Sequence, residues 1–533
     1  MSHILRILAL PTLALGLAIT GARGTVAAAP PAAGPVNCVA SDRPDATCNV
    51  VGGSNANQTA PNVSGASIGG GGEHDLPNRV TGDYGTIGGG LGNQAGDRAT
   101  VGGGSYNAAP GYRSTVGGGS SNTAQTAFTT IGGGENNIAS YFYATIGGGG
   151  GNASSGRYST IAGGSGNIAS FTHATIAGGS YNTASSINST VGGGDMNVAS
   201  GSFSTVSGGS NNHADGFNAI VAGGSGNFAM GDSTTIGGGL VNRAYGDYTT
   251  IAGGNGNVTG NPNSESRIAH YSAIGGGAHN IATGAFSTIP GGAANVAAAD
   301  FSLAAGRRAQ VDAAHAGSFL FADSNDSDFV SASANEFAVR ATGGVRFVTA
   351  IGSQGEPLSG ARLAPGSGSW STLSDRIAKS NIVAVDPHII LAQLMNVPMS
   401  TWSYKTEDPS VRHLGPMAQD FRAFGLGDDA RYISTVDANG VALAAIQGLA
   451  QIDQTRADQV AALTQQIAAL QSENAALNAR LDALSSRLDG LEQNAHTPSN
   501  PLESSLFVPS NLIVLGCVGA VGWLFGRRPG SSS

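Results

Sequence analysis

Ser374 and Lys379 are the two side chains of this chain whose types and spacing raise the question of covalent chemistry. A serine hydroxyl becomes a nucleophile when a base takes its proton, and a lysine amine is such a base only where burial or nearby positive charge favours its neutral form. Arg376 lies between the two and could supply that charge. Five residues place two side chains about 140° apart on a helix and on opposite faces of a strand. The spacing alone therefore favours a solvated turn, and catalysis would need a bend or a neighbouring subunit to bring the groups together.

Three blocks of sequence place this pair in a longer segment. They are SDRIAK at 374–379, RHLGPMAQDF at 412–421 and VDANGVALAAIQ at 436–447. Together they resemble the endosialidase-type intramolecular chaperone, the self-cleaving trimeric domain that ends many phage tail spikes and fibres. The resemblance covers residues 374–448 of the 533. It implies a small α+β domain, placed at 371–448, that helps three chains assemble and then separates from them.

The resemblance also implies which residues act. Cleavage in the family occurs just before a serine, and a lysine five residues further on assists it. The implied scissile bond is therefore Leu373–Ser374, with Ser374 as nucleophile and Lys379 as general base. The implied enzyme is an autoproteolytic serine peptidase that acts within its own chain and turns over once.

Other polar residues of the segment admit two interpretations. Asp375 could cap a helix that begins nearby, which would be a structural role. His413, Gln419 and Asp420 could complete a catalytic triad, or they could serve packing and hydrogen bonds between subunits. The sequence shows no cluster with metal-ligand spacing, and its Gly-x-Gly strings lack the strand–loop–helix context of a phosphate site, so we expect neither a metal nor a cofactor.

A repeat between about 51 and 309 is the longest element ahead of this segment. An apolar residue recurs every 15 residues, an asparagine follows it six residues later, and a threonine usually precedes it. Such a short period predicts a parallel β-solenoid, here a β-roll, in which isoleucine and valine fill the interior, glycines at the corners take positive φ, and asparagine amides bond to one another along the stack. The apolar positions are Val101, Val116, Ile131, Ile146, Ile161, Ile176, Val191, Val206, Val221, Ile236 and Ile251.

The repeat resembles the head of YadA-like trimeric adhesins, which associate in threes. That resemblance implies a homotrimer whose head could bind a host glycan or a matrix ligand. The register breaks after Ile251, where 259–269 is predicted to form an inserted surface loop, and it resumes at Ile274 and Ile289 before degrading at Ala304.

The segment 310–370 forms a predicted connector. Residues 319–323, 337–341 and 344–348 have the composition of strands, and the Gly-, Ser- and Pro-rich stretch 355–370 is predicted to be an exposed loop. Beyond 448, apolar residues alternate at spacings of three and four from Val460 to Leu491, which predicts a coiled coil over 449–495. Its core residues do not decide between two and three strands, whereas the family resemblance favours three.

The two ends of the chain indicate export and anchoring. Residues 1–29 have the order of a signal peptide, with an uncleaved anchor as the alternative. Residues 508–526 are almost wholly apolar and precede Arg527 and Arg528, which predicts a transmembrane helix followed by a cytoplasmic tail, 527–533; a buried helix is the alternative. The segments 30–50 and 496–507 are linkers. Cys38 and Cys48 could pair outside the cell, while Cys517 is expected to stay single.

Composition narrows the classes of function. Glycine at 84 residues and charged residues at 11% are unlike an ordinary globular protein. A net charge of −9 without a long basic run argues against nucleic acid as a partner. The repeat shows no carboxylate pair at a recurring position, which argues against a polysaccharide hydrolase.

The sequence therefore predicts a mainly β chain with an N-terminal parallel solenoid, a small self-cleaving chaperone domain, a coiled coil and a transmembrane helix. We expect an exported, membrane-anchored homotrimer whose chaperone domain drives assembly, cuts between Leu373 and Ser374, and sheds the head. The alternatives are an adhesin that is not cleaved and a solenoid that binds a surface through its threonines.

Overall fold

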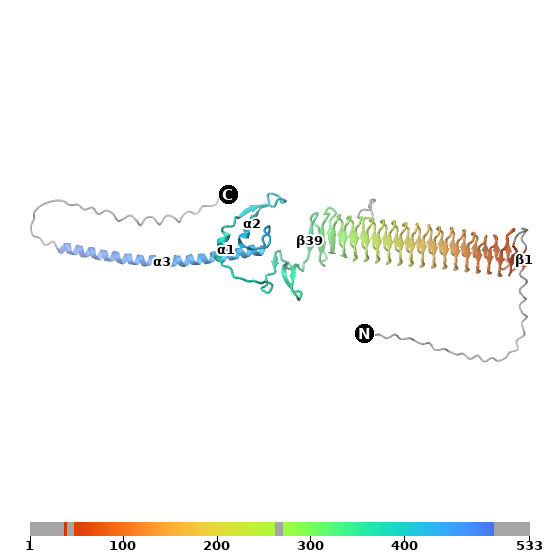
Figure 1. The fold of residues 1–533 in the computed structure, drawn as a ribbon, viewed down its shortest axis with the longest axis horizontal. Helices are drawn as coiled ribbons and strands as arrows, with labels where there is room; N and C mark the ends of the chain where they lie inside the picture. The colour runs from red at the N-terminus through yellow and green to blue at the C-terminus, as the bar shows by residue number, and fades with distance from the viewer. Residues whose placement is uncertain (1–36, 40–46, 262–269, 495–533) are drawn as a thin grey trace, which may run out of the picture. The chain divides into compact units, whose positions relative to one another are not determined.

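A computed structural model describes residues 37–39, 47–261 and 270–494 (Figure 1). Contacts divide the chain into two units, with the boundary between Ser371 and Thr372. The first unit is dominated by a stack of short strands, and the second by one long helix, α3 (Thr435–Asn494).

Two parallel ladders of short strands build the stack, one strand from each turn in each ladder. Thr115 pairs with Thr100 and Thr130 in the first sheet, and Thr123 pairs with Ala108 and Ile138 in the second, so neighbours differ by one repeat. This confirms the predicted parallel β-solenoid. The first sheet contains β2 (Asn49–Val51), β4 (Ser67–Ile68), β6 (Thr86–Ile87), β8 (Thr100–Val101), β10 (Thr115–Val116), β12 (Thr130–Ile131), β14 (Thr145–Ile146), β16 (Thr160–Ile161), β18 (Thr175–Ile176), β20 (Thr190–Val191), β22 (Thr205–Val206), β24 (Ile220–Val221), β26 (Thr235–Ile236), β28 (Thr250–Ile251), β30 (Ala273–Ile274), β32 (Thr288–Ile289), β33 (Gly292–Ala293), β35 (Leu303–Arg307), β37 (Phe319–Ala322) and β39 (Phe337–Arg340). The second contains β3 (Gln58–Thr59), β5 (Arg79–Val80), β7 (Gln94–Ala95), β9 (Ala108–Ala109), β11 (Thr123–Ala124), β13 (Ile138–Ala139), β15 (Ala153–Ser154), β17 (Ile168–Ala169), β19 (Thr183–Ala184), β21 (Val198–Ala199), β23 (His213–Ala214), β25 (Phe228–Ala229), β27 (Arg243–Ala244), β29 (Val258–Thr259), β31 (Ile281–Ala282), β34 (Val296–Ala297), β36 (Ala309–Val311) and β38 (Phe329–Val330).

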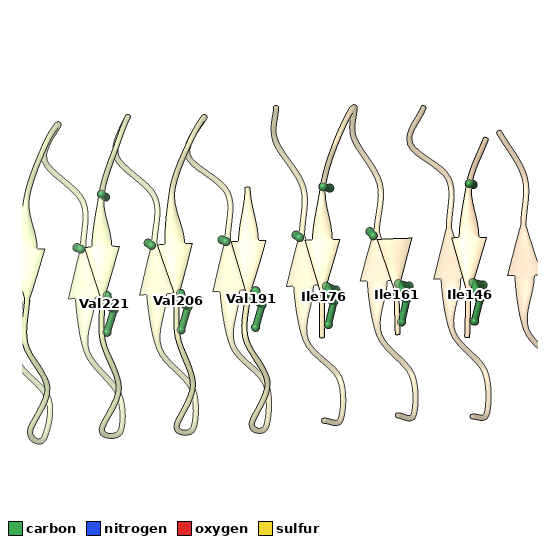
Figure 2. Close-up of a cluster of buried hydrophobic side chains, with 14 of the residues drawn as sticks. Ile146, Ile161, Ile176, Val191, Val206 and Val221 are labelled. Atoms are coloured by element: carbon green, nitrogen blue, oxygen red, sulfur yellow. The ribbon is translucent and has the colours of Figure 1, made fainter. Parts of the chain in front are cut away.

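The interior of the stack is a column of isoleucine and valine facing a column of alanine. Figure 2 shows Ile146, Ile161, Ile176, Val191, Val206 and Val221 at equivalent places in successive turns, and each is fully buried. Alanines such as Ala139 and Ala169 in the second sheet are buried as well. Burying a side chain of this size stabilises a protein by about 1.5–3 kcal/mol. One turn cannot cover its own apolar face, which explains why the repeat needs many copies.

A buried asparagine column runs along one corner. Asn152 donates from Nδ2 to the carbonyl oxygens of Gly148 at 3.0 Å and Gly164 at 2.9 Å, and its Oδ1 accepts the backbone N–H of Asn167 at 3.0 Å. The same pattern recurs from turn to turn. The predicted amide-to-amide ladder is therefore only partly right, because each amide mainly satisfies glycine carbonyls and the next turn's backbone. These bonds satisfy main-chain groups such as the Gly148 carbonyl and the Asn167 N–H, and they add a second donor to the Gly164 carbonyl, which also accepts the N–H of Gly150 at 2.9 Å.

Positive φ at the corners is not confined to glycine, which differs from the expectation. Gly134 has a φ of 93°, and a Cβ there would lie 2.0 Å from the carbonyl oxygen of Gly149. Two further positions in the repeat also have positive φ and in many turns carry side chains; examples are Asn136 at 57° and Tyr143 at 60°. Bulky residues are uncommon in this region because the Cβ approaches the backbone.

The stack begins and ends differently from its middle. At its start, β1 (Asn37–Val39) runs antiparallel to β2 in the register Cys38↔Val50, and Cys48 is disulfide-bonded. The register resumes after the insertion as predicted, with Ile251 paired to Ile274, while 262–269 lie outside the described residues.

Stacking also extends past the predicted end at Ala309. Leu303 pairs with Phe319 and Phe319 with Phe337, so β35, β37 and β39 continue the first sheet to Arg340. The 15-residue spacing is lost there, but the ladder is not, and Leu320 and Ala322 continue the buried interior. A sheet of β40 (Val345–Ile351), β41 (Pro357–Leu363) and β42 (Trp370–Thr372) follows, so the predicted loop 355–370 is in large part strand.

The second unit has little core of its own. It contains α1 (Pro387–Leu394), a hairpin of β43 (Ser400–Trp402) and β44 (His413–Gly415), α2 (Ala418–Phe421), the 3₁₀ helix η1 (Arg422–Phe424) and α3. Among its described residues, Val397, Phe421, Val441 and Ala445 are the buried apolar side chains. Helix α3 begins at Thr435, before the region 449–495 that was predicted to form a coiled coil.

The segments predicted to be a signal peptide, 1–29, and a transmembrane helix, 508–526, lie outside the described residues, as do the linker 496–507 and the tail 527–533. Across the described ranges, no helix combines the length and the apolar character that crossing a membrane requires.

Candidate active site around Ser374 and Lys379

A tight turn brings Ser374 and Lys379 together. The carboxylate Oδ1 of Asp375 accepts the N–H of Ile377 at 2.9 Å, and the Asp375 carbonyl accepts the N–H of Ala378 at 3.2 Å. The carbonyl of Arg376 accepts the N–H of Lys379 at 3.2 Å. The reversal places Lys379 Nζ 2.6 Å from Ser374 Oγ, to which it donates a hydrogen bond. This is the bend that neither a helix nor a strand could supply at this spacing.

Both side chains of the pair are exposed in the single chain, as are their neighbours. Leu373, on the other side of the implied scissile bond, is 39% exposed, and Ile377 within the turn is 90% exposed. Further along, Ile382 and Val383 are also exposed. Apolar side chains cost free energy in water, so this surface has the character of one that another chain covers.

Asp375 has a structural role, but not the one expected. It closes the turn at 376–378, and no helix begins there; the first helix of the unit begins at Pro387, where Asp386 Oδ1 accepts the N–H of His388 at 2.8 Å as the N-cap. Arg376 contributes its carbonyl to the turn, and its side chain is exposed. An aspartate side chain can close either an isolated turn or a helix start, which is why sequence alone did not separate the two.

His413 belongs to a different cluster. Its Nε2 lies 3.0 Å from Glu407 Oε2, and its ring packs against Trp402 at a centroid distance of 4.6 Å. The backbone N–H of Tyr404, and then His413, hold the pKa of the Glu407 carboxyl below its usual value. Sequence reasoning missed Glu407 and Trp402, because the β43–β44 hairpin that joins them to His413 has no strong local signal.

Gln419 and Asp420 lie on the short helix α2, and Asp420 donates its backbone N–H to the Met417 carbonyl at 3.0 Å. Among the described residues, neither these two side chains nor His413 forms a hydrogen bond with Ser374 or Lys379. The triad interpretation therefore gains no support from the described residues, and packing or contacts between subunits stays the alternative prediction.

Helices α1 and α3 hold the unit together through a close approach at Gly448. A Cβ on Gly448 would lie 2.5 Å from the Pro387 carbonyl oxygen and 3.3 Å from Leu391 Cβ. The absence of a side chain there lets α1 rest directly on α3. The Ser374 turn precedes α1 in the chain, so this packing supports the segment that follows the turn.

Gly448→Ala should disturb this packing. The added methyl group must displace α1, which is expected to destabilise the unit by about 1–3 kcal/mol. Thermal unfolding followed by circular dichroism measures the change. Gly440→Ala is the matched control, since that glycine lies in the same helix with nothing within 4 Å of an added Cβ; it should stabilise the helix by about 1 kcal/mol. Equal effects of the two substitutions would contradict the close approach.

A comparison with known protein families found a match to the segment that contains the site. Residues 374–426 match the family model described as chaperone of endosialidase. The match begins at Ser374 and includes the Ser374 turn, α1, the β43–β44 hairpin and α2. No curated protein matches the chain. The chain thus combines a parallel β-solenoid with a later segment that is similar to the chaperone of endosialidase.

Proposed function

We propose that this protein is an exported, homotrimeric surface fibre whose C-terminal unit drives assembly and then cuts the chain between Leu373 and Ser374. The observation that most supports this proposal is the 2.6 Å distance between Lys379 Nζ and Ser374 Oγ. These residues lie at the start of the segment that matches the chaperone family. Cleavage would leave the solenoid on one fragment and α3 on the other. With the membrane helix expected at 508–526, the cut would release the head from its anchor.

The proposed reaction uses the two side chains in sequence. The neutral amine of Lys379 takes the Ser374 hydroxyl proton as Oγ attacks the Leu373 carbonyl carbon. The proton passes to the Ser374 nitrogen as the peptide C–N bond breaks, which leaves the Leu373 acyl group as an ester on Oγ. Water then hydrolyses the ester, giving a Leu373 carboxylate and a free Ser374 amine. Each serine reacts once, since its own peptide bond is the substrate.

Exposed apolar surface in the second unit supports assembly of three copies. In α3, about 90 Å long for its 60 residues, a seam of apolar side chains is more than half exposed, including Val460, Ile467 and Leu488. A helix of this length with a continuous exposed seam is stable when other helices cover that seam. Three strands rather than two follow from the family resemblance.

The two sheets of the solenoid differ in how much apolar surface they expose. Outward positions of the first sheet are mostly threonine, whereas those of the second include Ile138, Ile168 and Ile281, which are 45%, 43% and 38% exposed. The apolar outer face of the second sheet is the surface we assign to contact with other copies. Each copy presents the same repeat, so three copies in register would match along their length.

Assembly before cleavage would follow from the exposure of Lys379. In the single chain the Lys379 side chain is exposed to water. Neighbouring copies that cover Ile377 and Ile382 would remove it from water and favour the neutral amine. The coiled coil would assemble first, because it makes later contacts between solenoids effectively intramolecular.

Fragment analysis tests the proposal. Mature protein is blotted with an antibody to the solenoid, and the small fragment is subjected to N-terminal sequencing. We expect a head fragment that ends at Leu373, a small fragment that begins with Ser374, and sedimentation as a trimer. Only full-length chain on the blot would refute cleavage, and a monomer in sedimentation would refute assembly.

A solenoid that binds a surface without being cleaved is the alternative. The outward threonines favour it, since Thr130, Thr145 and Thr160 pair in register and form a regular row of hydroxyls. The row is interrupted at Ile220 and Ala273. The same blot separates the two functions.

A further inference from the structure

A strip of exposed aromatic rings follows one corner of the solenoid. We define the aromatic strip as Phe128, Tyr143, Tyr158 and His173, each two residues before an outward position of the first sheet. Their rings stack face to face, with centroids 4.8 Å apart from Phe128 to Tyr143, 4.8 Å from Tyr143 to Tyr158, and 5.1 Å from Tyr158 to His173. Tyr143 and Tyr158 are each 40% exposed. The rings therefore present their edges and hydroxyls to water.

The backbone conformation at the aromatic strip is one that aromatic residues seldom adopt. All four residues have φ between 57° and 62°, a region that glycine and asparagine adopt more readily than aromatic residues do. The chain itself uses asparagine at the equivalent corner in Asn188 and Asn218. Stacking of the rings offsets part of the free-energy cost of this backbone conformation. Stacking alone, however, does not require the rings to be exposed or their hydroxyl groups to be free. The hydroxyls of Tyr143 and Tyr158 make no hydrogen bond within the described residues.

The surroundings of the strip are aromatic and basic. Tyr141, Phe142 and Phe171 flank it and are 48%, 46% and 48% exposed. Exposed arginines lie at the same corner: Arg157 packs over the Tyr158 ring at 5.0 Å and Arg113 over Tyr112 at 5.1 Å. Neither has a carboxylate partner in the part of the chain that the structure describes. From 110 to 205 this corner carries no Asp or Glu, whereas Asp215, Asp232, Asp247 and Asp300 occupy it in later turns.

We infer that the aromatic strip is a binding site for an extended polysaccharide that carries carboxylate groups. Tyrosine edges and hydroxyls suit the apolar and hydroxyl faces of sugar rings, the neighbouring outward threonines add donors, and the two arginines suit carboxylates. Turns repeat at about 4.8 Å, which is comparable with the advance of one sugar unit along an extended chain. This inference rests on the proposal that the solenoid is the head of a surface fibre, and it identifies that head's ligand class.

Binding of hyaluronan to the full chain tests the site, with dextran as the neutral polysaccharide and polyglutamate as the anionic non-saccharide. We expect saturable binding of hyaluronan that weakens as salt rises, and markedly weaker binding of the other two. The double substitution Tyr143→Asn/Tyr158→Asn should weaken hyaluronan binding by about tenfold or more. Arg157→Gln should weaken it and reduce its salt dependence.

Tyr181→Asn is the matched control. Tyr181 is exposed with a φ of 53° at the other corner, where Asn136 and Asn211 occupy the equivalent place, and its substitution should leave binding unchanged. Thermal unfolding of every variant verifies that the stack is intact. Unchanged hyaluronan binding in a folded double variant, or no saturable binding at all, would overturn the inference. Equal binding of dextran would overturn the carboxylate assignment, and equal binding of polyglutamate the saccharide assignment. Fragment size and sedimentation of the same samples report on cleavage and assembly separately.

Discussion

Ser374→Ala is expected to abolish cleavage while the protein still assembles. The substitution removes the only oxygen that can attack the Leu373 carbonyl in the proposed reaction, and it leaves the turn intact because Asp375 and the backbone close it. Lys379→Gln keeps a polar group near Ser374 Oγ but no base, so cleavage should slow by about 10²–10⁴-fold. The measurement is the fraction of cleaved chain against time after synthesis, by gel electrophoresis, with sedimentation on the same samples.

Ser380→Ala provides the control for this experiment. Ser380 is exposed and follows Lys379 directly, so its substitution changes a serine hydroxyl beside the base without touching the proposed nucleophile. We expect normal cleavage. A Ser374→Ala chain that is still cut before residue 374 would show that Ser374 is not the nucleophile, and loss of assembly in that variant would show a structural role.

Asn152→Ala should cause the second large effect, a loss of solenoid stability. Asn152 is fully buried, and its side chain satisfies the carbonyls of Gly148 and Gly164 and the N–H of Asn167. Alanine leaves the Gly148 carbonyl and the Asn167 N–H without these partners, while the Gly164 carbonyl keeps the N–H of Gly150 at 2.9 Å. Each group left without its partner costs about 1–3 kcal/mol, so the free energy of unfolding should fall by about 2 kcal/mol or more. Denaturant unfolding of the full chain followed by circular dichroism measures the loss.

Asn136→Gly is the matched substitution on the surface. Asn136 is exposed with a φ of 57°, and Gly151 and Gly166 occupy the same corner in the next turns, so the backbone accepts glycine there. Its effect should stay within about 0.5 kcal/mol. Similar losses for the two substitutions would mean that the buried column contributes no more than any surface asparagine.

Periodicity predicted the solenoid well because one turn dictates the next. An identical residue every 15 positions must stack on itself, so the buried isoleucines and the buried asparagines could both be foreseen. The ends could not. Beyond Ala309 the pairing of Leu303 with Phe319 keeps the ladder while the spacing changes, and a method that depends on the period cannot see it.

The site was predictable in its residues but not in its geometry. The family blocks pointed to Ser374 and Lys379, whereas their contact depends on the turn closed by Asp375, a local hydrogen bond with several possible outcomes. The pairing of His413 with Glu407 depends on a short hairpin whose strands are three residues each. Such short strands leave almost no pattern to recognise. In the proposed trimer, other copies would cover the exposed surface of this unit, and one chain cannot display those contacts.

The reversed strand at the beginning of the stack has a consequence for the length of the fibre. An open parallel ladder is a template on which another molecule's strand can continue to grow. Here β1 lies against β2 with opposite polarity, in the register Asn37↔Val51, and so occupies that first rung with a strand of the wrong direction for further parallel addition. The first sheet should therefore not be extended at this end by parallel addition of a strand from another molecule.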